Sequence, residues 1–302
     1  MKLFCLIMNT SMNKTDCPEL TLPVPVFFAI GVFSLMENLL VVVAVIYNRN
    51  LHSPMYGFMC SLAGFNTIAS LTKTCENVLL VFADAGQLER IGSYETKLDD
   101  VIDSVLCMSF LGSIFSFLAI AVDRYVSVFH ALRYHNIMTM RRTWTSLGII
   151  WTICGVSAMF IVSFFDFKFI MIFFVCLFLI CFVIICFLYV YMFMLARNHA
   201  RKIASVNSGG GENCRLRWWG GSMRGAITLT ILFGAFVLCW APFFLHVIIM
   251  AVCPTDPYCE CYRSLFQLHV LLLMSHALID PAIYAFRSAE LRHTFRKMIL
   301  CS

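Results

Sequence analysis

Long runs of apolar residues, separated by short polar stretches, dominate the chain. A helix needs about 20 apolar residues to cross the roughly 30 Å hydrocarbon core of a bilayer. Seven segments meet that length: approximately Val26–Tyr47, Met55–Phe82, Val101–Val128, Thr143–Phe165, Phe169–Ala196, Ala226–Val252 and Ser264–Phe286. They lack the alternation of apolar and polar residues that a transmembrane β-barrel shows. The pattern therefore predicts an all-α membrane protein, a seven-transmembrane helix bundle.

The boundary between the fourth and fifth segments is the weakest. Only Asp166, Phe167 and Lys168 interrupt an otherwise apolar run from Trp144 to Ala196. That run is too long for one span. We expect two helices joined by a very short loop.

The composition agrees with a membrane protein. Of the 302 residues, 61% are hydrophobic and 13% are charged, whereas a soluble domain has roughly 45–50% apolar and about 25% charged residues. So few charges could not cover the surface of a soluble fold. Disorder is excluded as well, because it requires low hydrophobicity.

Basic residues orient the bundle, because they gather on cytoplasmic loops. With the C-terminus inside, 15 of the 22 Lys and Arg residues are cytoplasmic: Arg49, Arg124, Arg133, Arg141, Arg142, Arg197, Arg201, Lys202, Arg215, Arg217, Arg224, Arg287, Arg292, Arg296 and Lys297. Seven spans then place the N-terminus outside, where the sequons at Asn9 and Asn13 can accept glycans. We divide the chain into an extracellular segment (1–25), a seven-transmembrane domain (26–286) and a short cytoplasmic amphipathic tail (287–302).

The acidic residues show the opposite bias. Twelve of the 17 lie on outer segments or in outer helical turns: Asp16, Glu19, Glu76, Asp84, Glu89, Glu95, Asp99, Asp100, Asp103, Asp166, Asp256 and Glu260. An anionic outer face attracts a cationic ligand. The alternative is that outer loops are polar only because they contact water.

Four short motifs fall on particular spans. The third span ends in Asp123-Arg124-Tyr125, the first carries Glu37-Asn38, the sixth holds Cys239-Trp240-Ala241-Pro242, and the seventh ends in Asp280-Pro281-Ala282-Ile283-Tyr284. Arginine at a helix end is costly to bury without a partner, and the neighbouring aspartate can supply one. The alternative is a snorkelling arginine. The prolines remove backbone hydrogen bonds and favour a kink beside Trp240, which is either a hinge or a static bend.

In this combination the motifs resemble class A G-protein-coupled receptors over the whole chain. Finer features resemble the melanocortin receptors: Asp99 stands where most relatives have cysteine, the second outer loop is almost absent, the fifth span lacks the usual proline, and the seventh has Asp280 where most relatives have Asn. Three segments carry the same likeness: Asp99–Ser104, Ala131–His135 and Cys253–Cys261. The resemblance implies a plasma-membrane receptor for a melanocortin peptide hormone, embedded in the lipid bilayer.

Within that family, several segments resemble the adrenocorticotropin receptors: Phe129–His135, Thr139–Thr143, Gly225–Leu232 and the tail Lys297–Ser302. This implies adrenocorticotropin as ligand, a stimulatory heterotrimeric G protein, cyclic AMP signalling and a single-span melanocortin receptor accessory protein. The rival within the family is a receptor for the shorter melanocyte-stimulating peptides.

An ion-coupled transporter is the alternative from another class, but the chain shows no paired halves. Neither an HExxH nor a GxSxG motif is present, so we expect no catalysis. No nucleic-acid partner is expected either.

Three acids mark the expected ligand site. Asp99 and Asp103 share one helix face because they are four residues apart, and Glu76 lies in the outer half of the second span. Converging carboxylates in a low-dielectric cavity need cations, and calcium suits oxygen ligands in irregular geometry. The family resemblance implies that these acids hold calcium and an arginine of the peptide. The alternative is local pairing with Lys73, Arg90 or Lys97.

Aromatic residues are the other expected ligand contacts. Phe243, Phe244 and His246 follow Trp240, and Phe266 opens the seventh span. Such rings can stack on the His-Phe-Arg-Trp core that the resemblance implies for the peptide. With 29 Phe in the chain, packing or contact with lipid is the alternative for each.

The 15 cysteines divide by location. Eight in the spans are expected to pack as small apolar residues: Cys60, Cys75, Cys107, Cys154, Cys176, Cys181, Cys186 and Cys239. Four lie outside, where the resemblance suggests the pairs Cys253–Cys259 and Cys17–Cys261; a zinc site is the alternative. Cys301, beside basic residues, is a candidate for palmitoylation, with a free thiol as the alternative.

Two departures from the receptor pattern affect function. Asn66 occupies the position where class A receptors usually have a sodium-binding Asp, while Asp280 supplies a carboxylate in the seventh span, so the usual Asp/Asn pair is exchanged. The third inner loop contains Ser208–Gly211 and Arg217–Gly221. We expect it to be a flexible linker.

Overall fold

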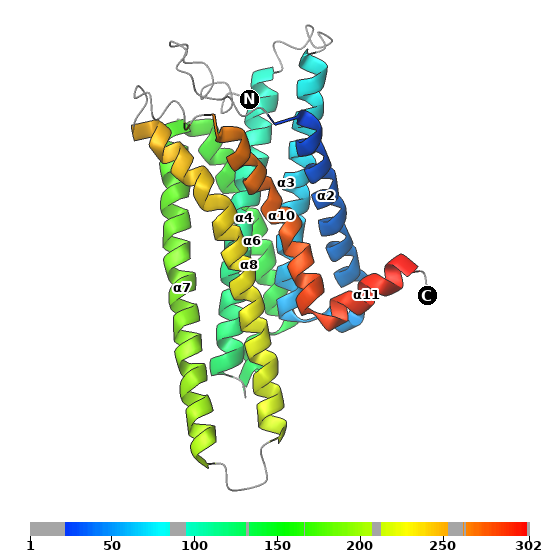
Figure 1. Cartoon of the computed structure of the whole chain (residues 1–302), viewed down its shortest axis with the longest axis vertical. Helices are drawn as coiled ribbons and strands as arrows, with labels where there is room; N and C mark the ends of the chain where they lie inside the picture. The colour runs from blue at the N-terminus through cyan, green and yellow to red at the C-terminus, as the bar shows by residue number, and fades with distance from the viewer. Residues whose placement is uncertain are drawn as a thin grey trace.

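The computed structural model describes residues 22–84, 95–130, 133–165, 167–206, 213–252, 262 and 264–300. Within these ranges, seven helices of 22 residues or more form a bundle (Figure 1): α2 (Val24–Tyr47), α3 (Pro54–Asp84), α4 (Glu95–Phe129), α6 (Met140–Phe164), α7 (Phe167–Val206), α8 (Asn213–Val252) and α10 (Phe266–Arg287). Shorter elements lie between and after them: η1 (Arg49–Leu51), α5 (Tyr134–Ile137) and α11 (Ala289–Leu300). The predicted seven-helix bundle is confirmed.

Six of these helices are long and apolar enough to cross a membrane, among the residues that the structure describes. The seventh long helix, α3, is more polar because Asn66, Ser70 and Lys73 interrupt its apolar sequence. Asn66 and Ser70 are buried within the bundle. The polarity of α3 therefore reflects groups that meet other helices and not the lipid.

The break between the fourth and fifth spans lies where the sequence predicted it. Helix α6 ends at Phe164, and Phe165 has extended backbone angles of φ −119° and ψ 147° before α7 begins at Phe167. Two separate helices therefore replace the single apolar run, as expected.

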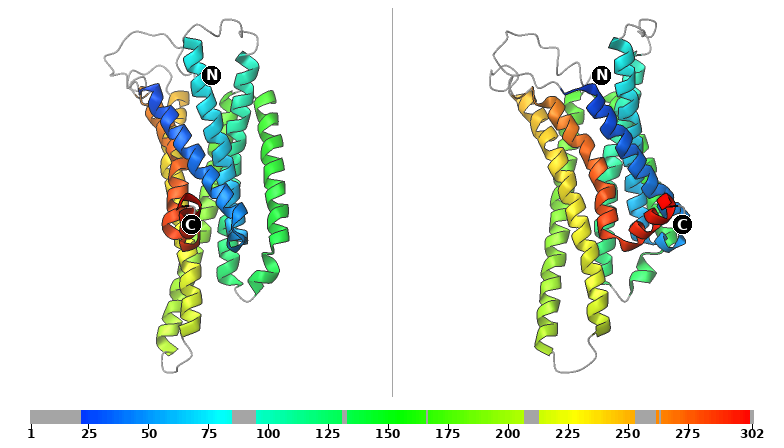
Figure 2. Two further views of the ribbon diagram at one scale, coloured as in Figure 1. Left: turned by 90° about the vertical axis from the view of Figure 1, so that its right-hand side faces the viewer. Right: turned by 45° about the vertical axis from the view of Figure 1, so that its right-hand side comes forward.

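The expectation of a linker at Arg217–Gly221 is wrong. Helix α8 begins at Asn213 and runs through these residues, and α7 continues to Val206. Once an apolar span has formed a helix, each further residue adds a hydrogen bond without a new nucleation cost, and here this outweighs the low helix propensity of glycine. Figures 1 and 2 show α7 and α8 projecting beyond the other helices on the cytoplasmic side.

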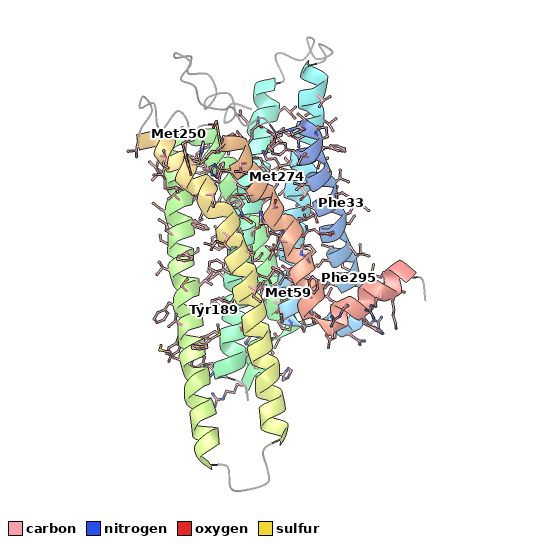
Figure 3. All side chains as sticks on the ribbon, viewed as in Figure 1. Phe33, Met59, Tyr189, Met250, Met274 and Phe295 are labelled. Carbon is pink, nitrogen blue, oxygen red and sulfur yellow. The ribbon has the colours of Figure 1, made fainter. Side chains whose placement is uncertain are left out.

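Helix α4 lies at the centre of the bundle, and its inner residues Ile114, Phe117, Ile120 and Ala121 are almost fully buried. Large apolar residues on the outside face the expected lipid; Phe33 of α2, labelled in Figure 3, is 65% exposed. Because lipid is as apolar as the core, exposed and buried phenylalanines occur side by side in the sequence.

Close packing of α3 and α4 depends on Gly112. A Cβ added there would lie 2.3 Å from the ring of Phe65. That ring is held in place because it stacks on Trp151 of α6 with 4.0 Å between centroids, and Trp151 Nε1 donates to Ser61 Oγ at 2.9 Å. Gly112 thus allows three helices to meet.

Helix α11 turns away from α10 at Ser288 and runs outward past the inner end of α2 (Figure 2). The Ser288 hydroxyl accepts a hydrogen bond from the Leu291 amide at 3.1 Å and caps the new helix. Tyr56 contacts Ser288 and Glu290, and Asn48 donates to Thr294 at 2.7 Å. These bonds attach the tail helix to α2 and α3.

Candidate ligand cavity and cytoplasmic coupling site

A cavity of about 180 Å³ opens among the outer halves of the helices. Five of the predicted ligand residues line it: Glu76, Asp103, Phe243, Phe244 and Phe266. Trp240, predicted as part of the hinge, lines it too. The structure thus brings carboxylates and aromatic rings from α3, α4, α8 and α10 into one wall.

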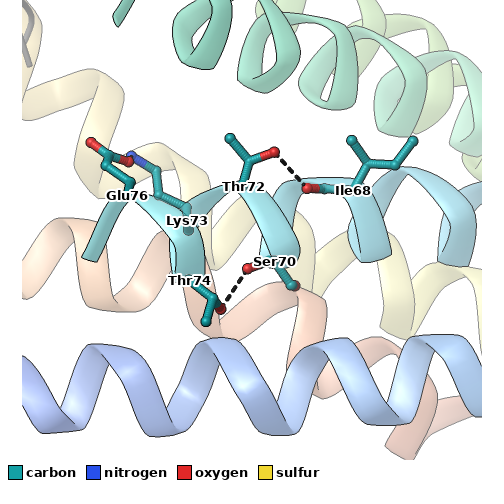
Figure 4. Close-up of polar contacts among 6 residues, drawn as sticks. All are labelled: Ile68, Ser70, Thr72, Lys73, Thr74 and Glu76. Atoms are coloured by element: carbon teal, nitrogen blue, oxygen red, sulfur yellow. Dashed lines mark hydrogen bonds and ion pairs between the residues drawn. The ribbon is translucent and has the colours of Figure 1, made fainter. Parts of the chain in front are cut away.

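Glu76 has a local partner inside the cavity. Lys73 lies one turn earlier on α3, and its Nζ is 2.7 Å from Glu76 Oε2 (Figure 4). Thr72 and Thr74 on the same turns donate to backbone carbonyls of Ile68 and Ser70, at 2.8 and 2.7 Å. The local pairing that the sequence left open as an alternative is therefore present for this acid.

The donor groups at the cavity mouth suit calcium in kind. Glu76 and Asp103 both offer carboxylate oxygens, the ligands that this hard cation prefers. Asp99 lies one turn outward from Asp103 on α4, and its side chain is outside the described residues. Among the described side chains, no group of three His, Cys, Asp or Glu residues could hold a metal. A calcium ion would compete with Lys73 for Glu76.

Phe110 is the aromatic centre of the cavity. Its ring centroid lies 4.3 Å from that of Trp240, 5.2 Å from Phe174 and 5.5 Å from Phe244. The sequence analysis missed this residue, although Phe110 lies seven positions after Asp103 and therefore on the same helix face. The seven-residue spacing from Asp103 could have identified Phe110 as a cavity residue.

His246 lies behind the cavity wall. It is fully buried, and its ring contacts Phe266, His269 and Tyr262 with centroids 5.4, 5.1 and 5.2 Å apart. The residue is absent from the cavity lining, unlike Phe243 and Phe244. In this arrangement His246 supports the wall through Phe266.

The exchanged pair Asn66 and Asp280 meets in the middle of the bundle. Asn66 Nδ2 donates to Asp280 Oδ2 at 2.9 Å, and both residues are buried. Asn38 joins α2 to α10 by donating to the carbonyl oxygen of Ala277 at 2.7 Å. The other oxygen of Asp280 has no hydrogen-bond partner in the described structure.

On the cytoplasmic side, Asp123 and Arg124 form a buried ion pair. Both Nε and Nη2 of Arg124 donate to Oδ2 of Asp123, the first at 3.0 Å. Arg124 is 8% exposed. A snorkelling arginine would extend to water, so the alternative interpretation of this residue does not hold.

Tyr134 also binds the Asp123 carboxylate, and the sequence analysis did not single out this residue. Its hydroxyl, carried by the short helix α5, donates to Asp123 Oδ1 at 2.8 Å. Burial, and then the neighbouring carboxylate, raise the pKa of Tyr134 well above its ordinary value. The hydroxyl therefore remains a donor at physiological pH.

Two prolines lie inside the helices that flank the centre. Pro242 is in α8 and Pro281 in α10. Trp240, next to Pro242, packs on Phe236 and His276 with centroids 5.5 and 5.4 Å apart. Tyr125 stacks on Phe129 at 4.4 Å, and Tyr284 is almost fully buried near the inner end of α10.

Several predicted sites lie outside the described residues. These are the disulfide cysteines Cys17, Cys253, Cys259 and Cys261, the sequons at Asn9 and Asn13, and Cys301. The eight cysteines expected to pack in the spans are all unbonded in the structure: Cys60, Cys75, Cys107, Cys154, Cys176, Cys181, Cys186 and Cys239.

Comparison with known proteins agrees with the fold and the motifs. The family described as "7 transmembrane receptor (rhodopsin family)" matches residues 37–170 and 160–284. Melanocortin receptor 4 of Danio rerio is 44% identical over 290 residues, which cover 96% of this chain and 87% of the relative.

Melanocortin receptor 3 of Mus musculus is 42% identical, over 94% of this chain and 87% of the relative. Melanocortin receptor 3 of Homo sapiens is 42% identical, over 97% and 90%. The chain therefore belongs to the melanocortin receptor family and is a plasma-membrane receptor, not an enzyme, with a peptide ligand and a G protein as partners.

Proposed function

We propose that this receptor binds adrenocorticotropin in the outer cavity and activates a stimulatory G protein, which raises cyclic AMP. The observation that carries the proposal is the outer cavity itself. Two carboxylates, Glu76 and Asp103, lie at its mouth, and an aromatic wall extends from them to Trp240. Such a site suits a peptide that presents a cation next to aromatic side chains.

The acids would orient the cationic part of the peptide. Glu76, Asp99 and Asp103 would hold calcium when it is bound, and the ion would supply positive charge that lets several carboxylates approach each other. Asp103 would then face the ligand from α4, while Phe243, Phe244 and Phe266 pack against its aromatic side chains. Lys73 would leave Glu76 as the cation arrives.

Ligand contact with the wall would be transmitted through Trp240. Because Trp240 adjoins Pro242, displacement of its ring can move the inner half of α8 about a point where the helix lacks a backbone hydrogen bond. The ligand would stabilise the conformation that has the opened inner cavity. Arg124 would exchange Asp123 for the G protein in that conformation.

The choice of adrenocorticotropin rests on the likeness of Phe129–His135, Thr139–Thr143 and the tail to adrenocorticotropin receptors. The alternative is a receptor for shorter melanocyte-stimulating peptides. The names of the relatives favour that alternative, because they are melanocortin receptors 3 and 4. A requirement for the accessory protein is expected only if adrenocorticotropin is the ligand.

Cyclic AMP measurements distinguish the two. Cells expressing the chain would be exposed to adrenocorticotropin and to the shorter peptide, with and without the accessory protein. A response to adrenocorticotropin that requires the accessory protein would support the proposal. A full response to the shorter peptide without the accessory protein would overturn it in favour of the alternative.

A further inference from the structure

Glu37 belongs to the Glu37-Asn38 motif of the first span, but it lies in neither the outer cavity nor the cytoplasmic coupling site. Asn38, the next residue, faces the bundle and donates to the carbonyl oxygen of Ala277 on α10 at 2.7 Å. Successive residues of a helix point about 100° apart, so Glu37 leaves α2 in another direction. It lines a groove between α2 and α10, which Figure 1 shows as neighbouring helices.

The groove follows one face of each helix and is open to the expected lipid. On α2 its lining includes Ala29, Phe33 and Glu37, which are four residues apart, and on α10 it includes Ala282 and Phe286, again four residues apart. All of these except the half-buried Glu37 are exposed. The alanines let another helix approach closely, because small residues bring helix backbones together in membranes. The shape of the groove therefore suits a neighbouring helix.

The carboxyl group of Glu37 lies deep in the membrane. It is 13 residues after Val24 and 10 residues before Tyr47, the two ends of α2, which corresponds to about 20 Å and about 15 Å of helix rise. Its Oε2 atom is buried and has no hydrogen-bond partner within the part of the chain that the structure describes. An acid at this depth is costly unless it is paired.

This depth restricts the partners that can reach Glu37. Lipid headgroups and water lie at the surfaces of the hydrocarbon core, roughly 15 Å from its centre. A transmembrane helix can carry a polar side chain to any depth, because its backbone groups are hydrogen-bonded internally. A second copy of this chain would place Glu37 against Glu37, and two carboxylates repel each other. A helix that carries lysine or arginine brings the opposite charge.

We propose that the groove between α2 and α10 docks a transmembrane helix of another protein, which carries a basic side chain near the middle of its span and pairs it with Glu37. The docked helix packs against Ala29 and Ala282. This interaction surface is separate from the outer cavity and from the Asp123–Arg124 pair, so it does not depend on which peptide the receptor binds.

Two synthetic helices test the charge pairing. Each consists of about 23 leucine and alanine residues, enough to span the core, and one has lysine at its centre where the other has leucine. Full-length receptor with a donor fluorophore would be placed in lipid vesicles with an acceptor-labelled helix, and energy transfer would be titrated against the helix-to-lipid ratio. We expect the wild-type receptor to bind the lysine helix about tenfold more tightly, which corresponds to about 1.4 kcal/mol. Equal binding of the two helices would overturn the proposal.

Three variants locate the binding site. Glu37→Leu removes the acid and leaves an apolar residue in the groove, so it should bind both helices equally weakly. Ala282→Leu keeps the acid but fills the groove, so it should bind the lysine helix less tightly than the wild type does. Val156→Leu is the control, because Val156 is an exposed residue of α6, and it should behave like the wild type. The Tm of each purified variant shows whether it is folded, and Ala282→Leu decides the question if Glu37→Leu is not.

Two results would contradict the proposed occupant. If the preference for the lysine helix persists in Glu37→Leu, that helix binds elsewhere. Energy transfer between receptors labelled with donor and acceptor tests the second copy. If Glu37→Leu abolishes that transfer while the wild type prefers neither synthetic helix, a second copy occupies the groove and the proposal is wrong.

Discussion

Tyr134 donates its hydroxyl to Oδ1 of Asp123 across 2.8 Å, while Arg124 binds the other oxygen of the same carboxylate. The aspartate thus joins the inner end of α4 to the helix that follows it. Both oxygens are occupied, so the Tyr134 hydroxyl helps to hold the carboxylate in the position at which it binds Arg124. We expect this arrangement to favour the inactive state, because activation would require Arg124 to leave Asp123.

Removal of the Tyr134 hydroxyl should raise basal signalling. Tyr134→Phe deletes one hydrogen bond to a charged group, which contributes about 1.5 kcal/mol, or about tenfold in an equilibrium. Basal cyclic AMP per surface receptor should increase by up to that factor. Tyr47→Phe is the control, because Tyr47 is 79% exposed at the end of α2; an equal increase in both variants would contradict the role of Tyr134.

The Asn66–Asp280 pair should tolerate exchange but not duplication of the acid. Asn66→Asp places two carboxyl groups in contact away from water, and an uncompensated buried charge costs about 3–5 kcal/mol. The variant should lose thermal stability, and sodium chloride should restore more of that stability than choline chloride does. The Tm of purified receptor in the two salts measures this.

The exchanged double variant provides the control. Asn66→Asp combined with Asp280→Asn keeps one amide, one carboxylate and a hydrogen bond between them. Its Tm should lie close to that of the wild-type receptor and show little preference for sodium. If the double variant is as unstable as Asn66→Asp, the loss of stability comes from placing the carboxylate on α3 and not from having two carboxylates.

Six of the seven helices could be predicted because each is a long apolar run, and α3 because its segment is apolar apart from a few polar residues. Adjacency in the sequence was enough to predict the Asp123–Arg124 pair. Sequence alone did not identify Phe110 as a cavity residue or show that His246 lies outside the cavity lining, since both helix faces are apolar in a bilayer: Phe110 is 5% exposed, whereas Phe33 is 65% exposed. Periodicity cannot distinguish core from lipid contact when both are hydrophobic.

Tyr134 illustrates a different limit. Its partner Asp123 is eleven positions earlier, and only the turn through α5 brings them together. The linker expected at Arg217–Gly221 was wrong because glycine content was given more weight than helix propagation from α8. Local composition therefore predicted elements but not their contacts or their full length.

Lys73 should control how much calcium the receptor needs. It neutralises Glu76 at 2.7 Å, so Lys73→Met leaves that carboxylate without its cation. Under the proposed calcium site, half-maximal agonist binding should require less calcium in Lys73→Met than in the wild-type receptor. Lys73→Arg keeps the charge and should behave like the wild type. Calcium titrations of radiolabelled peptide binding measure the difference.

Asp103→Asn tests the same site from α4. It removes a carboxylate that lines the cavity, so agonist binding and its calcium dependence should both weaken. Binding that is unchanged in this variant, with and without a chelator, would exclude Asp103 from the site. If Lys73→Met and the wild type titrate identically with calcium, Lys73 does not compete for Glu76.

Gly112 and Gly148 offer a matched test of helix packing. Gly112→Ala adds a methyl group 2.3 Å from the ring of Phe65, which Trp151 holds in place. Overpacking of this kind costs about 1–3 kcal/mol, so the Tm of the purified receptor should fall.

At Gly148 of α6, an added Cβ would meet nothing within 4 Å. Gly148→Ala should leave the Tm unchanged or raise it, because alanine favours a helix by about 0.5–1 kcal/mol over glycine. Equal Tm values for the two variants would mean that α3 and α4 can separate without loss, and the close approach at Gly112 would then not stabilise the bundle.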